Sequence, residues 1–203
     1  MTCSTSGPTS TSTNRKSLKA ERNAVSPCER ILGIDPGSTA TGWGVLERRG
    51  RAWRVAGHGV LRASAREELP ARLRSLHEKL SDLLDLWQPG EAAVEDLFHA
   101  RNARTTLTLG HARGVILLAL SQHGLSPISY AALTVKQAIT GSGSAEKIQV
   151  KQWLCRWLEI RPEGLSTDAS DALAVALCHA RSRTWPQPRA PSKSLVRAGV
   201  RRS

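Results

Sequence analysis

The chain has 203 residues, of which 40% are hydrophobic and 23% charged, a balance typical of one soluble globular domain with terminal extensions. No hydrophobic run approaches the length of a membrane span, and the N-terminal stretch lacks the apolar segment of a secretory signal. The net charge is +12, and the four cysteines form no C-x-x-C pair, so we expect neither a zinc site nor disulfides and favour a reducing, cytoplasmic compartment.

The first half of the chain predicts four strands and one helix. Three strands are expected at residues 31–35, 41–48 and 53–62. Leucines at helical spacing between Glu67 and Trp87 predict an amphipathic helix, which the following Pro-Gly pair ends. A fourth, very short strand is expected at residues 92–95, and it ends in a carboxylate as the first strand does.

The second half of the chain predicts one strand and four helices. The strand is expected at residues 126–131, and the helices at residues 103–122, 134–139, 145–160 and 167–183. Trp153 and Trp157 lie four residues apart in one of these helices, and we expect both in the core. A three-strand meander followed by alternating helices and strands indicates an α/β fold with a mixed five-stranded sheet flanked by helices.

The helix expected at residues 103–122 carries an unusual pair of glycines. Leu107 and Leu118 are expected on its buried sides. Gly110 and Gly114 are four residues apart and leave a bare strip along one face. Such a strip allows another backbone to approach closely, and the sequence leaves open whether this is the sheet or a second copy of the chain.

Two apolar strands each end in one carboxylate, Asp35 and Glu95. If these strands are parallel neighbours, both carboxylates lie at one edge of the sheet, where open α/β folds place their sites. Asp35 alone could instead form a turn by accepting hydrogen bonds from the amides of Gly37 and Ser38. Glu95 has no turn to make. A half-buried carboxylate is costly unless it is hydrogen-bonded, paired or bound to a cation.

Asp168 and Asp171 lie three residues apart at the start of the last expected helix, so they share one helix face. Ser166 or Thr167 can cap this helix. Acids in a first turn also interact favourably with the helix dipole, and this remains an alternative explanation of the pair.

Carboxylates gathered at one edge would repel one another unless cations neutralise them. Oxygen ligands without a neighbouring histidine or thiol suit Mg²⁺ or Mn²⁺ rather than Zn²⁺. Two such ions about 3.5–4 Å apart form the clamp for in-line phosphodiester hydrolysis, where one ion activates water and the other stabilises the departing 3′ oxygen. The acids therefore predict a two-metal phosphodiesterase site.

Five spaced motifs resemble the RuvC family of Holliday-junction resolvases, which have a ribonuclease H-like fold. The motifs are GIDPGS at 33–38, VEDLFHARN at 94–102, LGHARGV at 109–115, VKQAITGSGSAEK at 135–147 and DASDALAVA at 168–176. They occur in the family's order and cover about three quarters of the chain.

The resemblance implies a homodimeric endonuclease that resolves four-way DNA junctions in recombination and repair. It implies two Mg²⁺ ions per subunit, which Mn²⁺ can replace, and paired symmetric nicks that leave 5′-phosphate and 3′-hydroxyl ends. The family works with a branch-migration helicase of the RuvA and RuvB type. The catalytic and metal-binding positions of the family fall on Asp35, Glu95, Asp168 and Asp171.

The resemblance also implies DNA-binding residues. The aromatic residue that wedges into unstacked bases falls on Phe98, although the core is the usual place for a lone phenylalanine. The family's basic DNA-binding positions fall on Lys136 and Lys147. Arg101 and Arg104 lie close to Phe98 in the chain, and we expect them to contact DNA as well.

The excess charge is concentrated in the two ends of the chain. Residues 181–203 carry seven basic groups and no acids, and residues 1–30 carry five basic and two acidic groups. We expect a disordered extension at residues 1–29, a nuclease domain at 30–183 and a disordered basic tail at 184–203. The basic ends could hold a polyanion or could simply aid solubility.

Three other functions are compatible with parts of this pattern. An ATP-binding protein of the actin and sugar-kinase fold also opens with a strand and a D-x-G turn, but it needs a second lobe for which this chain has little room. A nucleic-acid-binding module without chemistry would not need the full set of acids. A ribonuclease H-like enzyme acting on RNA or single strands differs only in its substrate.

Overall fold

Five strands form one mixed sheet in the order β3-β2-β1-β4-β5. The computed structural model describes residues 29–96 and 103–183 of the chain. The strands are β1 (Arg30–Asp35), β2 (Ala40–Arg49), β3 (Ala52–Arg62), β4 (Glu91–Glu95) and β5 (Ile128–Tyr130). The first three strands are antiparallel, whereas β4 lies parallel to β1, and β5 parallel to β4. The predicted α/β class and mixed five-stranded sheet are confirmed.

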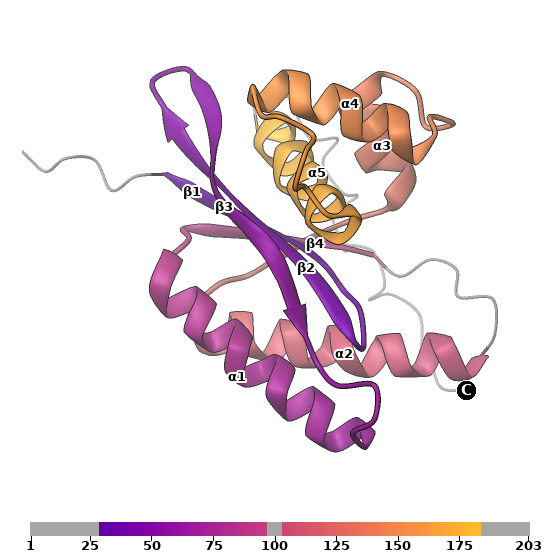
Figure 1. The fold of residues 1–203 in the computed structure, drawn as a ribbon. Coiled ribbons are helices and arrows are strands. Elements are labelled where there is room, and N and C mark those ends of the chain that lie inside the picture. Colours follow the sequence, from indigo (N-terminus) through magenta and orange to yellow (C-terminus); the bar gives the residue numbers. More distant parts are fainter. Residues whose placement is uncertain (1–28, 97–102, 184–203) are drawn as a thin grey trace, which may run out of the picture.

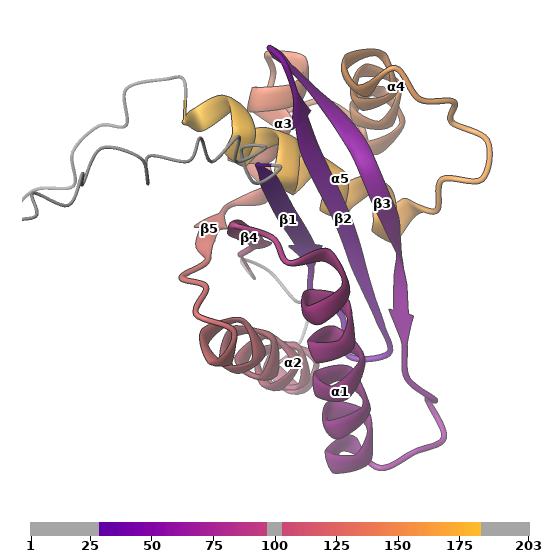
Figure 2. The same ribbon diagram turned by 90° about the vertical axis from the view of Figure 1, so that its left-hand side faces the viewer.

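Helices cover both faces of this sheet (Figures 1 and 2). One face carries α1 (Leu69–Trp87) and α2 (Ala103–Gln122), and the other carries α3 (Ala132–Thr140), α4 (Lys147–Leu158) and α5 (Thr167–Ser182). Each face has its own cluster of buried apolar side chains. None of the helices in the described ranges is both long and apolar enough to span a membrane.

The predicted elements are all present, and their ends differ from the prediction for local reasons. Helix α1 begins at Leu69, where Pro70 occupies the first turn, because a proline there loses no helical hydrogen bond. Helix α4 begins at Lys147 because Glu146 and Gln149 form a capping box, in which the Glu146 amide donates to Gln149 Oε1 at 3.0 Å. Strand β5 begins only after Pro127, which has no amide to give to a ladder.

Helix α5 lies unusually close to the sheet at two glycines. A Cβ atom added to Gly33 in β1 would lie 2.1 Å from the carbonyl oxygen of Ala172, and one added to Gly42 in β2 would lie 2.0 Å from that of Asp168. These are impossible contacts, so only glycine allows this approach. Because the helix is almost wholly buried along this side, the two glycines fix where its first turn stands relative to the ends of β1 and β4.

Two predictions about burial are wrong. The side chains of Leu107 and Leu118 in α2 are 63% and 52% exposed, although they were expected on buried sides of the helix. Trp153 and Trp157 in α4 were expected in the core, yet they are 42% and 48% exposed. Both tryptophans instead lie under guanidinium groups, those of Arg156 and Arg181 respectively.

The close approach of α5 predicts that Gly33→Ala destabilises the fold. The added methyl group has to displace the backbone of α5, and overpacking of this kind costs about 1–3 kcal/mol in the free energy of unfolding. Urea unfolding of the variant and its parent measures this cost. Gly90→Ala is the matched control, because the nearest atom to its new Cβ is 3.9 Å away. Equal losses for the two variants would contradict the packing argument.

Candidate active site

Asp35 and Glu95 lie side by side at one edge of the sheet, as their sequence context predicted. Strands β1 and β4 are parallel, and Ile34 stands opposite Val94 in their register. The next residue of each strand is the carboxylate, so the two acids leave the sheet at the same level. The edge lies at the carboxyl end of β1 and β4, where α/β folds place their sites.

In the turn that follows Asp35, the amide of Gly37 does not need the Asp35 carboxylate as a hydrogen-bond acceptor. The Gly37 amide donates a hydrogen bond to Thr41 Oγ1 at 3.3 Å, and the same hydroxyl donates to the Gly37 carbonyl at 2.8 Å. The alternative explanation of Asp35 was that its carboxylate accepts this hydrogen bond. At the Gly37 amide, the Thr41 hydroxyl is the acceptor instead.

The N-terminal part of α5 brings Asp171 to the same edge. Ser166 caps the helix by accepting a hydrogen bond from the Ala169 amide at 3.3 Å. Asp171 Oδ2 accepts a hydrogen bond from Lys147 Nζ at 2.8 Å. This bond raises the pKa of Lys147 above its usual value despite partial burial, so the ammonium stays charged beside the acids.

Asp168 lies one helical turn before Asp171, on the same face of α5. Its backbone carbonyl packs against Gly42 of β2, and its side chain is half-buried. Unlike the other three acids, it is not among the residues that line the cavity described below. The structure thus brings Asp35, Glu95 and Asp171 to one cavity and leaves Asp168 outside its lining.

The gathered carboxylates are electrostatically unfavourable. Burial, then the charge of Glu95 and the hydrogen bond with it, raise the pKa of Asp35 from 3.8 to about 8, and Asp171 adds to the effect. Burial also raises the pKa of Glu95, against the opposing effect of its hydrogen bond with Asp35. At neutral pH the pair therefore retains a proton, and its two members titrate together.

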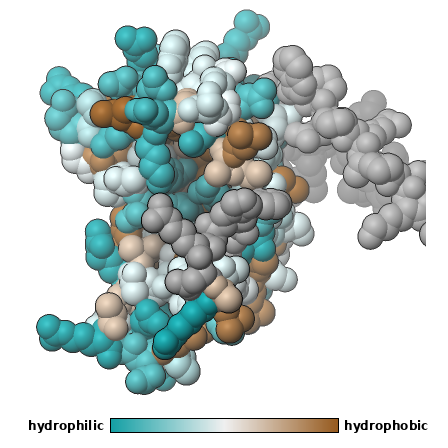
Figure 3. All heavy atoms as spheres, turned by 90° about the vertical axis from the view of Figure 1, so that its right-hand side faces the viewer, coloured by the Kyte–Doolittle hydropathy of each residue, from teal (hydrophilic) through white to brown (hydrophobic). Residues whose placement is uncertain are grey.

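A cavity of about 650 Å³ opens beside these acids. Its lining combines residues from the sheet edge and from four helices, α2, α3, α4 and α5. Apolar side chains such as Leu109, Val135 and Val150 form part of the wall, and the acids, two lysines and Thr106 form the rest. Figure 3 shows this side of the molecule, on which hydrophilic residues extend from the top to the middle.

The predicted DNA-binding residues divide into three groups. Lys136 and Lys147 line the cavity, and both of their charges lower the pKa of Glu95. Arg104 lies in the exposed first turn of α2, outside the lining. Phe98 and Arg101 fall outside the residues that the structure describes.

Two residues at this edge were not recognised from the sequence. Asp96 lines the cavity directly after Glu95, and its position next to a strand-ending acid was the available signal. Arg113 of α2 lies 3.3 Å from Asp96 Oδ1, and a contact between residues so far apart in the chain leaves no local signal.

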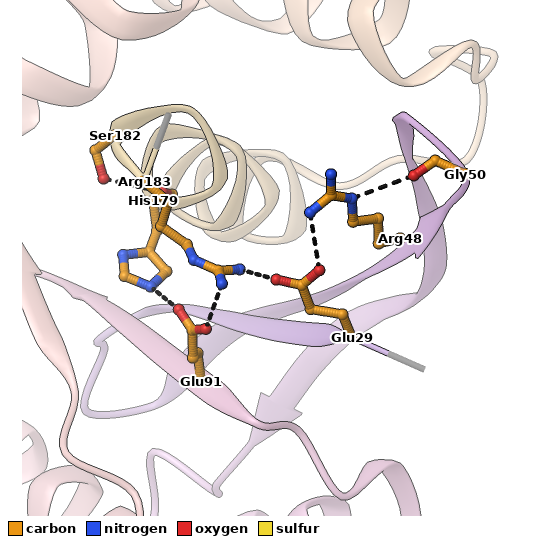
Figure 4. Close-up of polar contacts among 7 residues, drawn as sticks. All are labelled: Glu29, Arg48, Gly50, Glu91, His179, Ser182 and Arg183. Carbon is orange, nitrogen blue, oxygen red and sulfur yellow. Dashed lines mark hydrogen bonds and ion pairs between the residues drawn. The ribbon is translucent and has the colours of Figure 1, made fainter. Parts of the chain in front are cut away.

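A second charged cluster lies at the other end of β1 and β4, and its groups are paired with one another (Figure 4). His179 Nε2 is 2.7 Å from Glu91 Oε2, and Arg183 binds both Glu91 and Glu29. The ring of His179 also contacts the Tyr130 hydroxyl through Nδ1 at 2.8 Å. These contacts attach the end of α5 to the start of β1 and β4, which is a structural role.

The donor set at the carboxyl edge fits a hard divalent cation. In residues 29–96 and 103–183, no group of three or more His, Cys, Asp or Glu side chains is already arranged to hold a metal ion, and the Lys147 ammonium takes an oxygen of Asp171. Burial is the main cause of the raised pKa of Asp35, and the negative charges of Glu95 and Asp171 add to it; those same charges would attract a cation. Carboxylate oxygens are the ligands that Mg²⁺ and Mn²⁺ prefer. A cation would enter by displacing the proton that Asp35 and Glu95 retain, together with the lysine.

Comparison with known proteins places the whole described domain in one family. The family model described as crossover junction endodeoxyribonuclease RuvC matches residues 31–179. A protein of that name from Magnetococcus marinus is 41% identical over 166 residues, which are 82% of this chain and 92% of that protein. Another from Granulibacter bethesdensis is 46% identical over 157 residues, 76% of this chain and 86% of that protein.

Solved structures agree with this assignment. Thermus thermophilus RuvC in complex with a Holliday junction substrate superposes with a TM-score of 0.72 at 31% identity, over 77% of this chain and 96% of that one. The yeast mitochondrial Holliday junction resolvase Ydc2 superposes with a TM-score of 0.60 at 16% identity, over 78% of this chain and 80% of that one, and this shows a shared fold.

The raised pKa of Asp35 predicts that stability falls with rising pH when divalent cations are removed. Between about pH 4 and pH 8 the folded protein holds a proton that the unfolded chain has lost, so the free energy of unfolding decreases through this window. Asp35→Asn should flatten the decrease, because the amide cannot ionise. Urea unfolding at pH 5 to 8 with a chelator measures both slopes.

Asp82→Asn is the control for this titration, because it removes an exposed carboxylate on α1 far along the chain from the site. Its slope should match that of the parent. A slope that is the same in the parent and in Asp35→Asn would show that Asp35 does not titrate in this window.

Proposed function

The chain belongs to the RuvC family of crossover junction endodeoxyribonucleases, and we propose that Asp35, Glu95, Asp168 and Asp171 form the centre that cuts the DNA. As a member of this family, it is a metal-dependent endonuclease that resolves Holliday junctions. The observation that carries the assignment of the centre is the burial of Asp35 beside Glu95 and Asp171 at one edge of the sheet.

Asp35, Glu95 and Asp171 would hold the metal ions, with Asp168 completing the set. We infer two Mg²⁺ ions per subunit, with Mn²⁺ as a substitute, because four carboxylates supply enough oxygen ligands for a pair. When bound, such a pair supplies the Lewis-acid chemistry of phosphodiester hydrolysis and leads to 5′-phosphate and 3′-hydroxyl ends. Asp35 has to lose its proton first, so metal affinity should increase with pH up to about 8.

Lys147 has two possible partners in this scheme. Its ammonium is bonded to Asp171 in the protein alone, at the start of α4. A phosphate of the junction would take over the lysine while Asp171 turns to metal. Lys136, which lines the same cavity, would hold a second phosphate oxygen.

The remaining predicted DNA contacts surround the cavity. Arg104 is exposed at the start of α2, the helix whose residues Thr106 and Leu109 line the cavity wall. Phe98 and Arg101 precede this helix in the chain, and we propose that Phe98 stacks on an unpaired base at the crossover. The basic residues 184–203 would add phosphate contacts without sequence preference as a tail outside the nuclease domain of residues 30–183, and residues 1–29 would form a second extension.

We propose a homodimer that forms through the outer face of α2. A Cβ atom added to Gly110 or Gly114 would meet no atom within 4 Å, so the bare strip does not pack on the sheet. Leu107 and Leu118 flank this strip on the same helix face and are also exposed. An apolar face with a glycine strip permits a second α2 to approach closely, and a dimer with two centres would cut the two opposed strands of a junction symmetrically.

The cellular process and the partner that we propose are those of the family's reaction. A resolvase acts on junctions made during recombination and DNA repair, and we propose that it cooperates in the cytoplasm with a branch-migration helicase of the RuvA and RuvB type. Such a helicase would move the crossover until a cleavable sequence reaches the cavity.

Asp35→Asn should bind a synthetic four-way junction as the parent does but lose cleavage by more than about a hundredfold, which even outer-shell changes at metal sites can approach. The asparagine keeps the shape of the side chain but lacks the charge needed to hold a cation. Gel-shift titration and cleavage with Mg²⁺ measure the two properties. The parent should cut the junction with paired nicks and spare linear duplex. Equal cutting of both DNAs would contradict the junction specificity.

Leu118→Glu should convert the dimer to a monomer, because a charge would be buried at the proposed α2 contact. Sedimentation equilibrium measures the mass, and nicking of a supercoiled cruciform plasmid measures whether both strands are cut in one binding event. Leu86→Glu is the matched control, because Leu86 is exposed on α1 outside that face. A Leu118→Glu protein of unchanged mass would place the dimer contact elsewhere.

A further inference from the structure

Arg113 connects helix α2 to the two strand ends that form the edge of the site. One of its terminal nitrogens, Nη2, donates to Ser129 Oγ in β5 at 2.6 Å and lies 3.3 Å from Asp96 Oδ1, directly after β4. A single guanidinium group therefore bridges three segments that are distant in sequence. The planar fork of arginine suits such a bridge, whereas lysine offers only a point charge.

The bridge stands one residue from Glu95. Glu95 is paired with Tyr130 in the register of β4 and β5, and the Asp96 amide donates to the Tyr130 carbonyl at 2.8 Å. Backbone hydrogen bonds thus join the two strands up to Asp96. The Arg113 side chain adds a second connection between them, through Asp96 and Ser129. Arg113 therefore contacts the residue that directly follows the carboxylate Glu95.

The burial of the Arg113 side chain lowers the stability of the fold, and this points to a role beyond packing. The Arg113 side chain is only 21% exposed. Its Nε is buried and has no hydrogen-bond partner among the residues that the structure describes. A buried donor without a partner lowers the stability of the fold, so an apolar side chain would fill the space at lower cost. The chain nevertheless carries an arginine here, at the edge that carries the acids.

The charge of Asp96 gives a second reason for the arginine. Asp96 lines the same cavity as Asp35, Glu95 and Asp171, so it adds a carboxylate to a place where negative charge is already unfavourable. The guanidinium group neutralises Asp96 and turns it toward β5.

We propose that Arg113 is a positioning residue that holds Asp96 and the end of β4 so that Glu95 presents its carboxylate to the metal centre. This inference rests on the proposed function, because it assigns Glu95 a metal. It does not place Arg113 in contact with the metal or with the DNA. Arg113 acts through Asp96 and Ser129, and its effect should appear first in metal binding.

The test compares Arg113→Met and Arg113→Lys with the parent protein. Calorimetric titration with Mn²⁺ in the absence of DNA should show an affinity at least about fivefold weaker for Arg113→Met, within the range of outer-shell changes at metal sites. Junction cleavage should need more Mg²⁺ for half its maximal rate and should fall at least about tenfold at a fixed, limiting concentration. Junction affinity without divalent ions should stay within about twofold, because Arg113 is not a DNA contact.

Arg113→Lys should recover part of the metal affinity, because it keeps the charge beside Asp96 but not the bridge to Ser129. Arg74→Met is the matched control on α1, where the arginine is exposed and its contact with Glu78 is long, at 3.9 Å, and it should leave every measurement unchanged. Thermal unfolding of each variant shows whether it is folded. If Arg113→Met fails to fold, Arg113→Lys carries the test alone.

Parent-like Mn²⁺ affinity in a folded Arg113→Met or Arg113→Lys protein would overturn the positioning role, even if the parent cleaves junctions as expected. Equal losses of metal affinity and of metal-free junction affinity would also overturn it, because they would indicate a general structural role. A parent protein that binds Mn²⁺ but spares junctions would instead refute the proposed function, and the metal titration would still decide the role of Arg113.

Discussion

The mutual repulsion of buried carboxylates is the constraint on which this protein's site depends. Asp35 lies in a poorly solvated position beside Glu95 and within range of Asp171, and these surroundings raise the pKa of Asp35 to about 8. A fold gains nothing in stability from such an arrangement, since it forces a carboxyl group to retain a proton at neutral pH. The arrangement becomes favourable once cations are present, which is what a metal-dependent nuclease requires.

The scaffold imposes this arrangement through ordinary packing. The parallel register of β1 and β4 sets Asp35 and Glu95 at one level. Gly33 and Gly42 allow α5 to lie against the sheet, and its buried length fixes the position of the N-terminal part of the helix, which carries Asp171. The contacts of His179 and Arg183 fix the other end of the same helix. Stability is thus supplied away from the site, and the unfavourable charge is concentrated at one edge.

Much of the fold could be predicted from the sequence, because hydrophobic periodicity and turn residues mark nearly every element. The edge carrying Asp35 and Glu95 was also predictable, since each acid ends an apolar strand. The exposure of Leu118 and Trp153 was not predictable. Apolar residues occur around most of α2, and periodicity identifies a helix face without saying whether another element covers it. The Arg113 bridge depends on tertiary contacts between distant segments, which leave no spacing to recognise.

The central claim is that these carboxylates form one metal centre, and a crystal soaked in Mn²⁺ tests it most directly. Anomalous scattering should show manganese between Asp35, Glu95 and Asp171, with Asp168 at the border and the Lys147 contact with Asp171 opened. Crystals of the Asp35→Asn protein should lose this signal. Manganese bound only elsewhere on the protein, with the ion pair of Lys147 and Asp171 intact at saturating Mn²⁺, would contradict the account.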